Sequence, residues 1–116
     1  MHELPITKSI FASVIKHAEQ NGAKTVEKVC LEVGELREFI EEIVQKYWDY
    51  ISRGSIAEHA RVEITTIPIT ARCGMCDTVY GIDVLAISES ICPKCGHESG
   101  ELLTGRELRI RGIEIT

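Results

Sequence analysis

Several features that mark particular classes of protein are missing from this sequence. The longest apolar runs fall far short of the roughly 20 residues that a membrane span needs. The N-terminal residues lack the positive region and the apolar region of a secretory signal, so we expect a cytoplasmic protein without a membrane partner. The 13 basic residues are outnumbered by 18 acidic ones, and the net charge of −5 would repel a nucleic acid over most of the surface.

The length and composition indicate a small soluble protein. With 116 residues, of which 44% are apolar and 27% are charged, the chain can build one modest hydrophobic core. A second independent core would need an additional cross-link, such as a bound metal ion. No internal repeat, low-complexity tract or long linker is seen, so we expect the parts of the chain to be closely joined.

The first half of the chain predicts two helices with a strand between them. Apolar residues recur at three- and four-residue steps from Ile6 to Gln20, which predicts an amphipathic helix that ends at Asn21-Gly22. Residues 25–34 alternate between apolar and polar side chains and predict a half-buried strand. A second helix is expected from Arg37 to Ser52. Its apolar face would be formed by Phe39, Ile40, Ile43, Val44, Tyr47, Trp48 and Ile51.

Two further β-rich segments flank a region of different composition. Residues 61–71 and 107–115 both change the parity of their apolar side chains, near Thr66 and across Gly112, which indicates a bulge or burial of both faces. We expect these two strands to be neighbours. Residues 72–105, between them, contain four of the five cysteines and five of the nine glycines.

The predicted fold class is therefore α+β. Two helices would pack on a three-stranded sheet in a small N-terminal domain formed by residues 1–71 and 106–116. Residues 72–105 would form an inserted, zinc-ribbon-like domain built on four cysteines.

The cysteines are spaced as in a four-thiolate metal site. Cys73 and Cys76 form one Cys-x2-Cys pair, Cys92 and Cys95 form another, and fifteen residues separate the two pairs. Two such turns can bring four thiolates into a tetrahedron around one cation, with Zn–S distances near 2.3 Å. Because this arrangement leaves no open coordination position, we expect a structural zinc ion and not a catalytic one.

Other interpretations of the cysteines stay open. Two disulfides would also use the four residues, although a cytoplasmic location disfavours them, and iron could occupy the same thiolates. His97, two residues after the last cysteine, is either an auxiliary, exchangeable ligand or a surface imidazole. The fifth cysteine, Cys30, is expected to be a packed hydrophobic residue of its strand.

The N-terminal residues offer a second set of metal ligands. Met1, His2 and Glu3 supply an α-amine, an imidazole and two backbone amides, which together suit a square-planar nickel(II) or copper(II) ion. Because His2 is too large for the usual removal of the initiator methionine, we expect the Met1 amine to be present. Taken alone, a histidine near a flexible terminus does not identify a site.

Several motifs form a recognisable whole when they are taken together. They are the opening Met1-His2-Glu3-Leu4, the segment Val33-Gly34-Glu35-Leu36, Pro68 before the first cysteine pair, the Cys92-Pro-x-Cys95-Gly pair and the final strand from Glu107 to Glu114. In these motifs the chain resembles the HypA/HybF family of hydrogenase nickel-incorporation proteins, over essentially its whole length. It departs from the family at Pro5, where serine is frequent, and at Gly74, where some members have a histidine.

The resemblance implies a nickel metallochaperone. Its nickel ligands would be the Met1 amine, the His2 imidazole and the backbone amides of His2 and Glu3. Its zinc ligands would be Cys73, Cys76, Cys92 and Cys95. The implied partners are an accessory GTPase of hydrogenase maturation and the large subunit of a [NiFe] hydrogenase, and a homodimer is compatible with the sequence. No catalytic residue is implied, so the chain would not itself be an enzyme.

Two other functions compete with nickel delivery. A zinc-ribbon adaptor that binds nucleic acid shares the four-cysteine pattern, but residues 72–104 carry two basic and five acidic side chains, the opposite of the expected sign. A metalloenzyme would need an open metal position or a nucleophile with its base, and the sequence shows neither such a pattern nor a Gly-rich phosphate loop. A group of acidic side chains is expected to be a solvated face and, secondarily, a docking surface. This group is Glu35, Glu38, Glu41 and Glu42.

Overall fold

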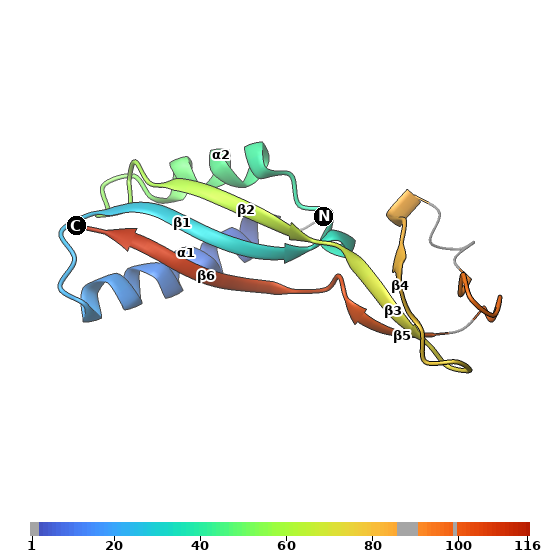
Figure 1. Ribbon diagram of the computed structural model, residues 1–116. Coiled ribbons are helices and arrows are strands. Elements are labelled where there is room, and N and C mark those ends of the chain that lie inside the picture. Colours follow the sequence, from blue (N-terminus) through green and yellow to red (C-terminus); the bar gives the residue numbers. More distant parts are fainter. Residues whose placement is uncertain (1–2, 86–90, 99) are drawn as a thin grey trace. The chain divides into compact units, whose positions relative to one another are not determined.

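The computed structural model describes residues 3–85, 91–98 and 100–116. Over these ranges the chain forms helices, a short 3-10 turn and strands in an α+β arrangement, as predicted (Figure 1). The elements are α1 (Glu3–Gln20), β1 (Val26–Gly34), η1 (Glu35–Arg37), α2 (Glu41–Ile51), β2 (Arg61–Ile67), β3 (Ile69–Cys73), β4 (Val79–Ile82), β5 (Gly100–Thr104) and β6 (Leu108–Ile115). Neither described helix has the length and apolarity needed to span a membrane.

The chain divides into two compact units. The first unit comprises Met1–Glu32, Phe39–Thr65 and Arg109–Thr116, and the second comprises Val33–Glu38 and Thr66–Leu108. The first contains both helices and most of a sheet with the strand order β2-β1-β6, and the second contains a sheet with the order β4-β3-β5. The boundaries of an inserted domain at residues 72 and 105 stay a prediction.

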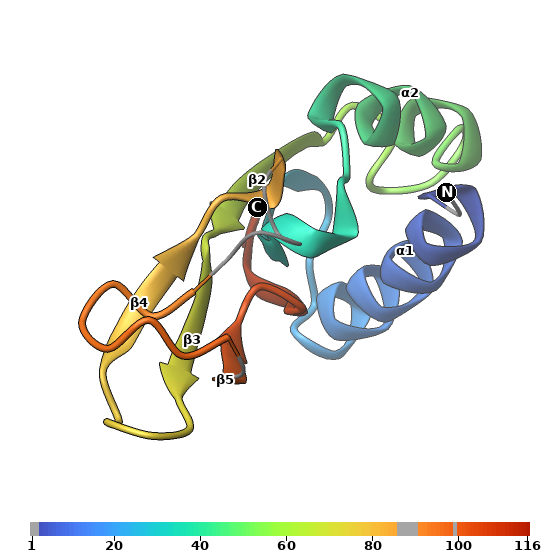
Figure 2. The same ribbon diagram turned by 90° about the vertical axis from the view of Figure 1, so that its right-hand side faces the viewer.

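In the first unit, both helices lie on the same face of the sheet β2-β1-β6 (Figures 1 and 2). Trp48 of α2 meets Phe11 of α1 edge to face, with ring centroids 5.4 Å apart. Its indole Nε1 donates a hydrogen bond to the carbonyl of Ala57 (3.1 Å), so the large ring is buried without an unpaired polar atom. Other fully buried side chains of this unit are Val14, Val29, Leu31, Val44 and Val62.

Helix α1 begins at Glu3, earlier than the Ile6 expected from the apolar periodicity. Pro5 lies in the first turn, where the missing N–H of a proline has no intrahelical partner to lose. The predicted stop is confirmed. Gly22 has φ +67°, Ala23 N donates to Ala18 O (3.0 Å) and Gly22 N donates to Glu19 O (3.1 Å), which closes the helix in a Schellman motif.

Helix α2 is shorter than predicted. The chain from Glu35 to Arg37 forms the 3-10 turn η1, Glu38 has the left-handed φ of 54°, and Ile40 is extended, so the helix begins only at Glu41. The prediction of a helix from Arg37 was therefore wrong at its start. Ile40, expected on the buried face, is 43% exposed, whereas Val44 and Trp48 are buried as expected.

The β-rich residues 61–71 belong to two sheets. Strand β2 ends at Ile67 and β3 starts at Ile69, so the change of parity marks a break at Pro68 and not a bulge near Thr66. The expected pairing of this segment with residues 107–115 is also wrong, because β1 lies between β2 and β6. The change of parity across Gly112 is confirmed by the exposure of β6, in which Arg111 and Gly112 are both exposed between alternating half-buried residues.

In the second unit, β3 is the central strand. It pairs antiparallel with β4, with Ala71 opposite Tyr80, and antiparallel with β5, with Cys73 opposite Gly100. The residues after β5 return past η1 at very close range. A Cβ on Gly34 would lie 2.1 Å from the carbonyl carbon of Gly105, so both positions require glycine. Hydrogen bonds from Gly34 N to Glu107 O (2.7 Å) and from Leu36 N to Gly105 O (2.9 Å) hold this contact.

Candidate metal centre

The first cysteine pair lies on the hairpin between β3 and β4. Cys73 is the last residue of β3, and Cys76 lies in the turn that precedes β4. Asp77, the residue after Cys76, has φ +60°, which turns the chain back toward β4. The turn is closed by hydrogen bonds from Asp77 N to Cys73 O (3.2 Å) and from Cys73 N to Thr78 O (2.9 Å).

The second cysteine pair repeats this backbone geometry. Gly96, the residue after Cys95, has φ +77°. Gly96 N donates to Cys92 O (2.9 Å) and Cys92 N donates to His97 O (2.9 Å), which are the equivalents of the two bonds in the first turn. The repeat arises because each Cys-x2-Cys segment needs a left-handed residue directly after its second cysteine to return the chain. Glycine meets that need after Cys95, and aspartate meets it after Cys76.

The two turns bring four sulfur atoms together. The Sγ atoms of Cys73, Cys76, Cys92 and Cys95 all lie within 4.8 Å of one another. Two of the separations, Cys73 to Cys95 and Cys76 to Cys92, are 3.5 Å. Tetrahedral coordination with bonds near 2.3 Å would place the sulfurs roughly 3.8 Å apart. All five cysteines are free thiols, so the four grouped sulfurs fit one tetrahedral cation and the structure contains neither of the two disulfides.

Backbone amides support the sulfurs. Met75 N lies 3.4 Å from Cys73 Sγ, and Lys94 N lies 3.4 Å from Cys92 Sγ, one amide for the first cysteine of each pair. Such N–H donors lower the energy of a thiolate and fix the direction of its lone pairs. Cys73 and Cys92 are also buried, at 1% exposure each, and pack with Ala71 and Tyr80. One side of the centre therefore lies in the interior of the second unit, whereas Cys76 is half-buried and Cys95 is exposed.

One supporting residue was not predicted from the sequence. The Thr78 hydroxyl lies 3.1 Å from Cys76 Sγ, and hydrogen bonds from Thr78 lower the pKa of Cys76 to about 6. For Cys95 the hydrogen bond with the backbone of His97 is the largest single influence and also lowers the pKa, but the neighbouring sulfurs and burial together outweigh it, and the pKa rises to about 12. Four thiols at this range cannot all ionise unless a cation offsets their repulsion, so the site is chemically suited to a divalent metal ion.

The other cysteine and histidine candidates lie outside the sulfur group. His97 contributes its backbone carbonyl to the second turn, and its imidazole is not among the atoms that lie within 4.8 Å of one another. Its role as an auxiliary ligand stays a prediction. Cys30 is half-buried in β1 and is not part of the group either.

Of the predicted nickel ligands, Met1 and His2 lie outside the described residues. Glu3 is described, as the first residue of α1. Its backbone carbonyl accepts a hydrogen bond from the Thr7 hydroxyl (2.5 Å). Its side chain is only 6% exposed, and its Oε2 has no hydrogen-bond partner among the described residues. A buried carboxylate oxygen without a hydrogen-bond partner costs free energy. A hydrogen-bond donor or a cation next to Glu3 would therefore be favourable at the start of α1.

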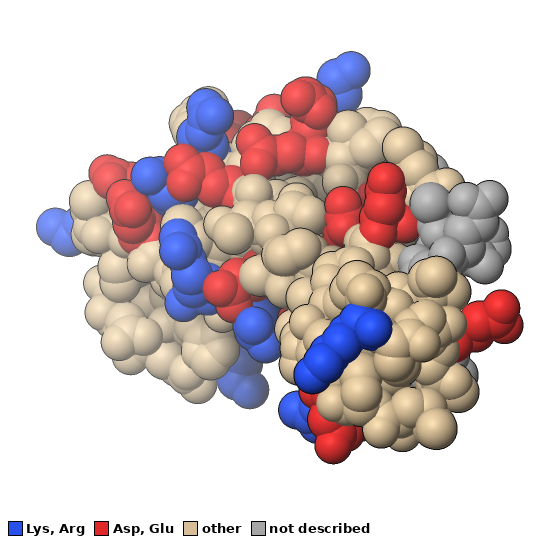
Figure 3. Space-filling model, turned by 45° about the vertical axis from the view of Figure 1, so that its right-hand side comes forward, with Lys and Arg blue, Asp and Glu red and all other residues tan. Residues whose placement is uncertain are grey.

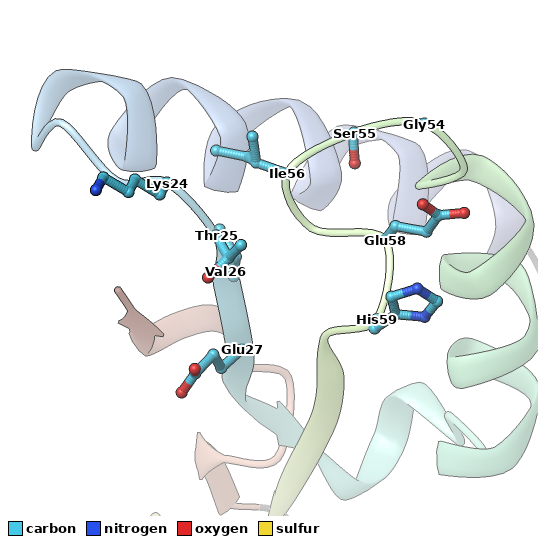
Figure 4. A pocket seen from close by; sticks show the side chains of 9 residues that line it. All are labelled: Lys24, Thr25, Val26, Glu27, Gly54, Ser55, Ile56, Glu58 and His59. Carbon is cyan, nitrogen blue, oxygen red and sulfur yellow. The ribbon is translucent and has the colours of Figure 1, made fainter.

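A surface cavity of about 560 Å³ in the first unit holds none of the predicted site residues (Figure 4). Its titratable lining consists of Lys24, Glu27, Glu58 and His59. These side chains do not converge, because Lys24 and Glu27 extend away from Glu58 and His59 in Figure 4. The cavity therefore offers no ligand set that would compete with the four sulfurs as a metal site.

The face shown in Figure 3 carries charges of both signs. Its acidic side chains lie among its basic ones. Glu41, expected on a solvated face, is instead half-buried and accepts a hydrogen bond from Ile64 N (2.9 Å). One of the four acidic side chains, Glu41, therefore stabilises the fold and does not lie on a fully solvated face.

The fold and site define a small α+β metal-binding protein whose thiolate centre suits a structural ion. A family model described as "Hydrogenase/urease nickel incorporation, metallochaperone, hypA" matches residues 1–115, and the chain belongs to this family.

Curated relatives agree with this assignment. The hydrogenase maturation factor HypA of Nostoc punctiforme is 38% identical over 115 residues, which are 99% of this chain and 96% of that protein. The HypA of Geobacter sulfurreducens is 32% identical over 99% of both chains. The solution structure of the Ni metallochaperone HypA from Helicobacter pylori has a TM-score of 0.66 at 23% identity, over 99% of this chain and 97% of that chain. A second solution structure of a HypA protein has a TM-score of 0.73 at 23% identity, over 100% and 97%. Both solved structures have the same fold as this chain.

Proposed function

We propose that the protein is a nickel carrier that binds Ni(II) through its N-terminal residues and helps to insert it into the large subunit of a [NiFe] hydrogenase. The chain would act without catalysis, in the cytoplasm, where a reducing environment keeps thiols free. Membership of the nickel-incorporation family, over residues 1–115, is the observation that carries this proposal. The family description includes urease, and the names of the curated relatives favour hydrogenase.

The zinc ion belongs to the scaffold in this proposal. Cys73, Cys76, Cys92 and Cys95 would hold Zn(II), because their sulfurs already have tetrahedral spacing and no fifth protein ligand or open position is needed. The ion would supply charge neutralisation for four thiolates and a fixed junction between the two turns. This role needs no exchange of the metal during nickel delivery.

The nickel site would be formed by the Met1 amine, the His2 imidazole and the backbone amides of His2 and Glu3. These nitrogen donors suit the square-planar preference of Ni(II). Glu3, the last residue of this proposed ligand set, begins α1, and this position at the start of a helix supports the proposal. Nickel binding would displace protons from the amine, the imidazole and the amides, so affinity would fall in mild acid.

The proposed partners are the accessory GTPase of hydrogenase maturation and the hydrogenase large subunit. A carrier must bind nickel firmly enough to select it and release it on contact with the next protein. Cu(II) binds such donors more tightly than Ni(II), so the handover partner, and not affinity alone, would give selectivity.

The test is a calorimetric titration with nickel of the zinc-loaded full chain with its native N-terminus. Two altered chains serve as comparisons: His2→Ala, and a chain with one extra residue before Met1. Elemental analysis of each sample gives its zinc content. We expect about one nickel per native chain and no nickel at this site in either altered chain, because each change removes a required donor.

Two results would overturn the proposal. Equal nickel binding by all three chains would mean that the site is not at the N-terminus. No nickel binding by the native chain, with zinc present, would favour the zinc-ribbon adaptor.

A further inference from the structure

The strand β4 has backbone groups that its own sheet does not use. It borders the sheet β4-β3-β5 on one side (Figures 1 and 2). Cys73 N donates to Thr78 O (2.9 Å), so the backbone groups of Thr78 point toward β3. The register between the two strands continues without a shift to Ile82. Because backbone groups alternate in direction along a strand, those of Val79 and Gly81 point outward.

These outward groups are accessible. At the β2 edge of the other sheet, side chains of α2 occupy the outward amides, as Gln45 Oε1 does for Val62 N (2.7 Å). On β4, Val79 and Gly81 are exposed, and no side chain among the described residues accepts a hydrogen bond from either amide. An edge strand with free backbone groups can pair with a further strand.

Gly81 gives the backbone of a further strand room to approach. A Cβ at this position would meet only Ile69 O, at 4.0 Å, and the residue does not have a positive φ. The fold of the second unit therefore does not itself require glycine here. A glycine inside a strand often marks a place where another backbone comes close. The space beside Gly81 is open to a side chain of an added strand.

Exposed apolar side chains accompany this edge. Met75 lies in the hairpin before β4, Val79 lies in the strand and Leu85 follows it. They are 72%, 53% and 92% exposed. An extended aliphatic segment along β4 would remove part of this surface from water, and exposed apolar surface of this extent is typical of protein–protein contacts.

The charges near β4 indicate which side chains the added strand would carry. Asp77 precedes the strand and Asp83 follows it, and neither carboxylate has an ion-pair partner among the described residues. Arg72, on the central strand β3, lies opposite Val79. A basic side chain near each end of β4 would therefore be favourable, whereas one in the middle would meet a like charge.

We propose that β4 binds an extended segment of a partner protein, which pairs antiparallel with it. The segment carries aliphatic side chains opposite Val79 and Gly81 and a basic side chain near Asp77 and near Asp83. Backbone hydrogen bonds supply the affinity, and the side chains supply the selectivity. Because β4 has only 4 residues, the contact is weak and reversible, with a Kd of about 0.1–1 mM. It does not involve the proposed nickel ligands.

The probe is a synthetic peptide, acetyl-Lys-Thr-Val-Thr-Val-Thr-Lys-amide, whose two valines can lie opposite Val79 and Gly81. It is titrated into the isotope-labelled, zinc-loaded full chain, and amide signals are followed by NMR. We expect the signals of Val79 and Gly81 to shift with a Kd of about 0.1–1 mM. Hydrogen exchange of the two amides should slow at least about twofold when the peptide is in excess. The signals of α1 should stay in place.

Two control peptides separate backbone pairing from charge. Methylation of both valine nitrogens removes the donors for the outward carbonyls of β4 and should abolish the shifts. Replacement of both lysines by glutamate should weaken binding at least about tenfold. This difference should become smaller at about 1 M salt, where exposed charges are screened.

Three variants of the chain separate the edge from folding. Gly81→Pro removes an outward N–H that β3 does not use, so it should fold and not bind the peptide. Val79→Lys changes an exposed side chain, should also fold, and should weaken binding at least about tenfold. Leu103→Lys is the matched control on β5, the opposite edge, and should bind as the native chain does. Dispersion of the β3 amide signals reports folding.

Three results would overturn the proposal. The first is slow exchange of the Val79 and Gly81 amides in the free chain, which would mean that another part of the chain or a second copy covers the edge. The second is equal binding of the methylated peptide, which would exclude strand pairing. The third is the absence of shifts at Val79 and Gly81 with the lysine peptide at about 5 mM. None of these results would change the outcome expected for the nickel titration.

Discussion

The two compact units bury their interiors by different means. In the first unit, two helices cover a sheet, and the buried side chains include Trp48 and Leu31, at 1% exposure each. In the second unit, the buried cluster is Ala71, Cys73, Tyr80 and Cys92, so half of it consists of candidate metal ligands. The second unit also leaves large apolar side chains in solvent: Met75, Val79, Leu85, Ile91 and Leu103.

This difference indicates what each unit depends on. Apolar burial can stabilise the first unit without any bound group. The second unit has too few buried apolar side chains to offset the conformational entropy of its residues, so it needs the cross-link that a metal ion supplies. Each prediction below changes one of the two units.

Removal of the metal ion should have the largest effect. With a strong chelator, or in Cys92→Ser, the amide signals of β3, β4 and β5 are expected to lose their dispersion in NMR spectra, while those of α1 and β1 persist. Cys30→Ser is the matched control and should leave both units folded. Retention of the β3–β5 signals in the metal-free chain would show that the second unit folds without a metal ion.

Truncation of the central side chain of the first unit should come next. Trp48→Ala removes a fully buried ring together with its hydrogen bond to Ala57, and should lower the free energy of unfolding by about 3–5 kcal/mol. Urea unfolding followed by circular dichroism measures the change. Tyr50→Ala, at a residue 63% exposed on the same helix, should change it by at most about 0.5 kcal/mol. An equal loss in both variants would contradict the assignment of this core.

A smaller effect is expected from Gly34→Ala. The new Cβ would lie 2.1 Å from the backbone of Gly105, so the chain must shift, at a cost of about 3 kcal/mol. Gly81→Ala in β4 is the control, because its Cβ would meet only Ile69 O at 4.0 Å. Thermal unfolding that is unchanged in Gly34→Ala would mean that η1 and the residues after β5 are not in contact.

The acid stability of the metal centre should depend on Thr78. Thr78 lowers the pKa of Cys76 from 9.0 to about 6. The contribution of this thiolate to the stability of the folded chain is therefore complete above pH 9 and is lost as the pH falls through about 6. Thr78→Val raises that pKa, and protons then displace the metal ion at a higher pH. Metal release followed with a colorimetric zinc indicator should therefore move to higher pH in Thr78→Val and stay near the native midpoint in Thr78→Ser. A midpoint that is the same in all three chains would remove Thr78 from the centre.

The smallest effect is expected at the exposed Lys28. Glu114 and, to a smaller extent, Glu63 raise the pKa of this lysine. The contribution of the charged lysine to the stability of the fold is therefore present below its ordinary pKa of 10.5 and is lost as the pH rises above that value. Lys28→Met should lower the urea midpoint slightly at low salt and not at about 1 M salt, where surface charges are screened. A loss that persists at high salt would point to packing of the lysine stem.

The sequence predicted the features that depend on local spacing. The pairs Cys73/Cys76 and Cys92/Cys95 act within short turns, so their grouping could be inferred without a structure, and the stop of α1 at Gly22 has an equally local cause. The order β2-β1-β6 could not be inferred, because parity reports which side of a strand is covered and not which strand is its neighbour.

Other features depend on contacts between distant residues or on one backbone angle. The left-handed Glu38 delays α2 to Glu41, although the apolar periodicity of a helix continues through residues 37–40. Thr78 gave no signal of its own, since serine and threonine are ordinary residues of turns. Its position relative to Cys76 Sγ is visible only in three dimensions.

The central claim is a division of labour: sulfur ligands hold a scaffold ion in the second unit, and nitrogen ligands hold nickel at the N-terminus. X-ray absorption at the zinc and nickel edges of one sample, loaded with both ions, tests it directly. The predicted result is a zinc spectrum with four sulfur neighbours near 2.3 Å and a nickel spectrum with nitrogen or oxygen neighbours and no sulfur. Sulfur neighbours at the nickel edge would contradict the division and place nickel among Cys73, Cys76, Cys92 and Cys95.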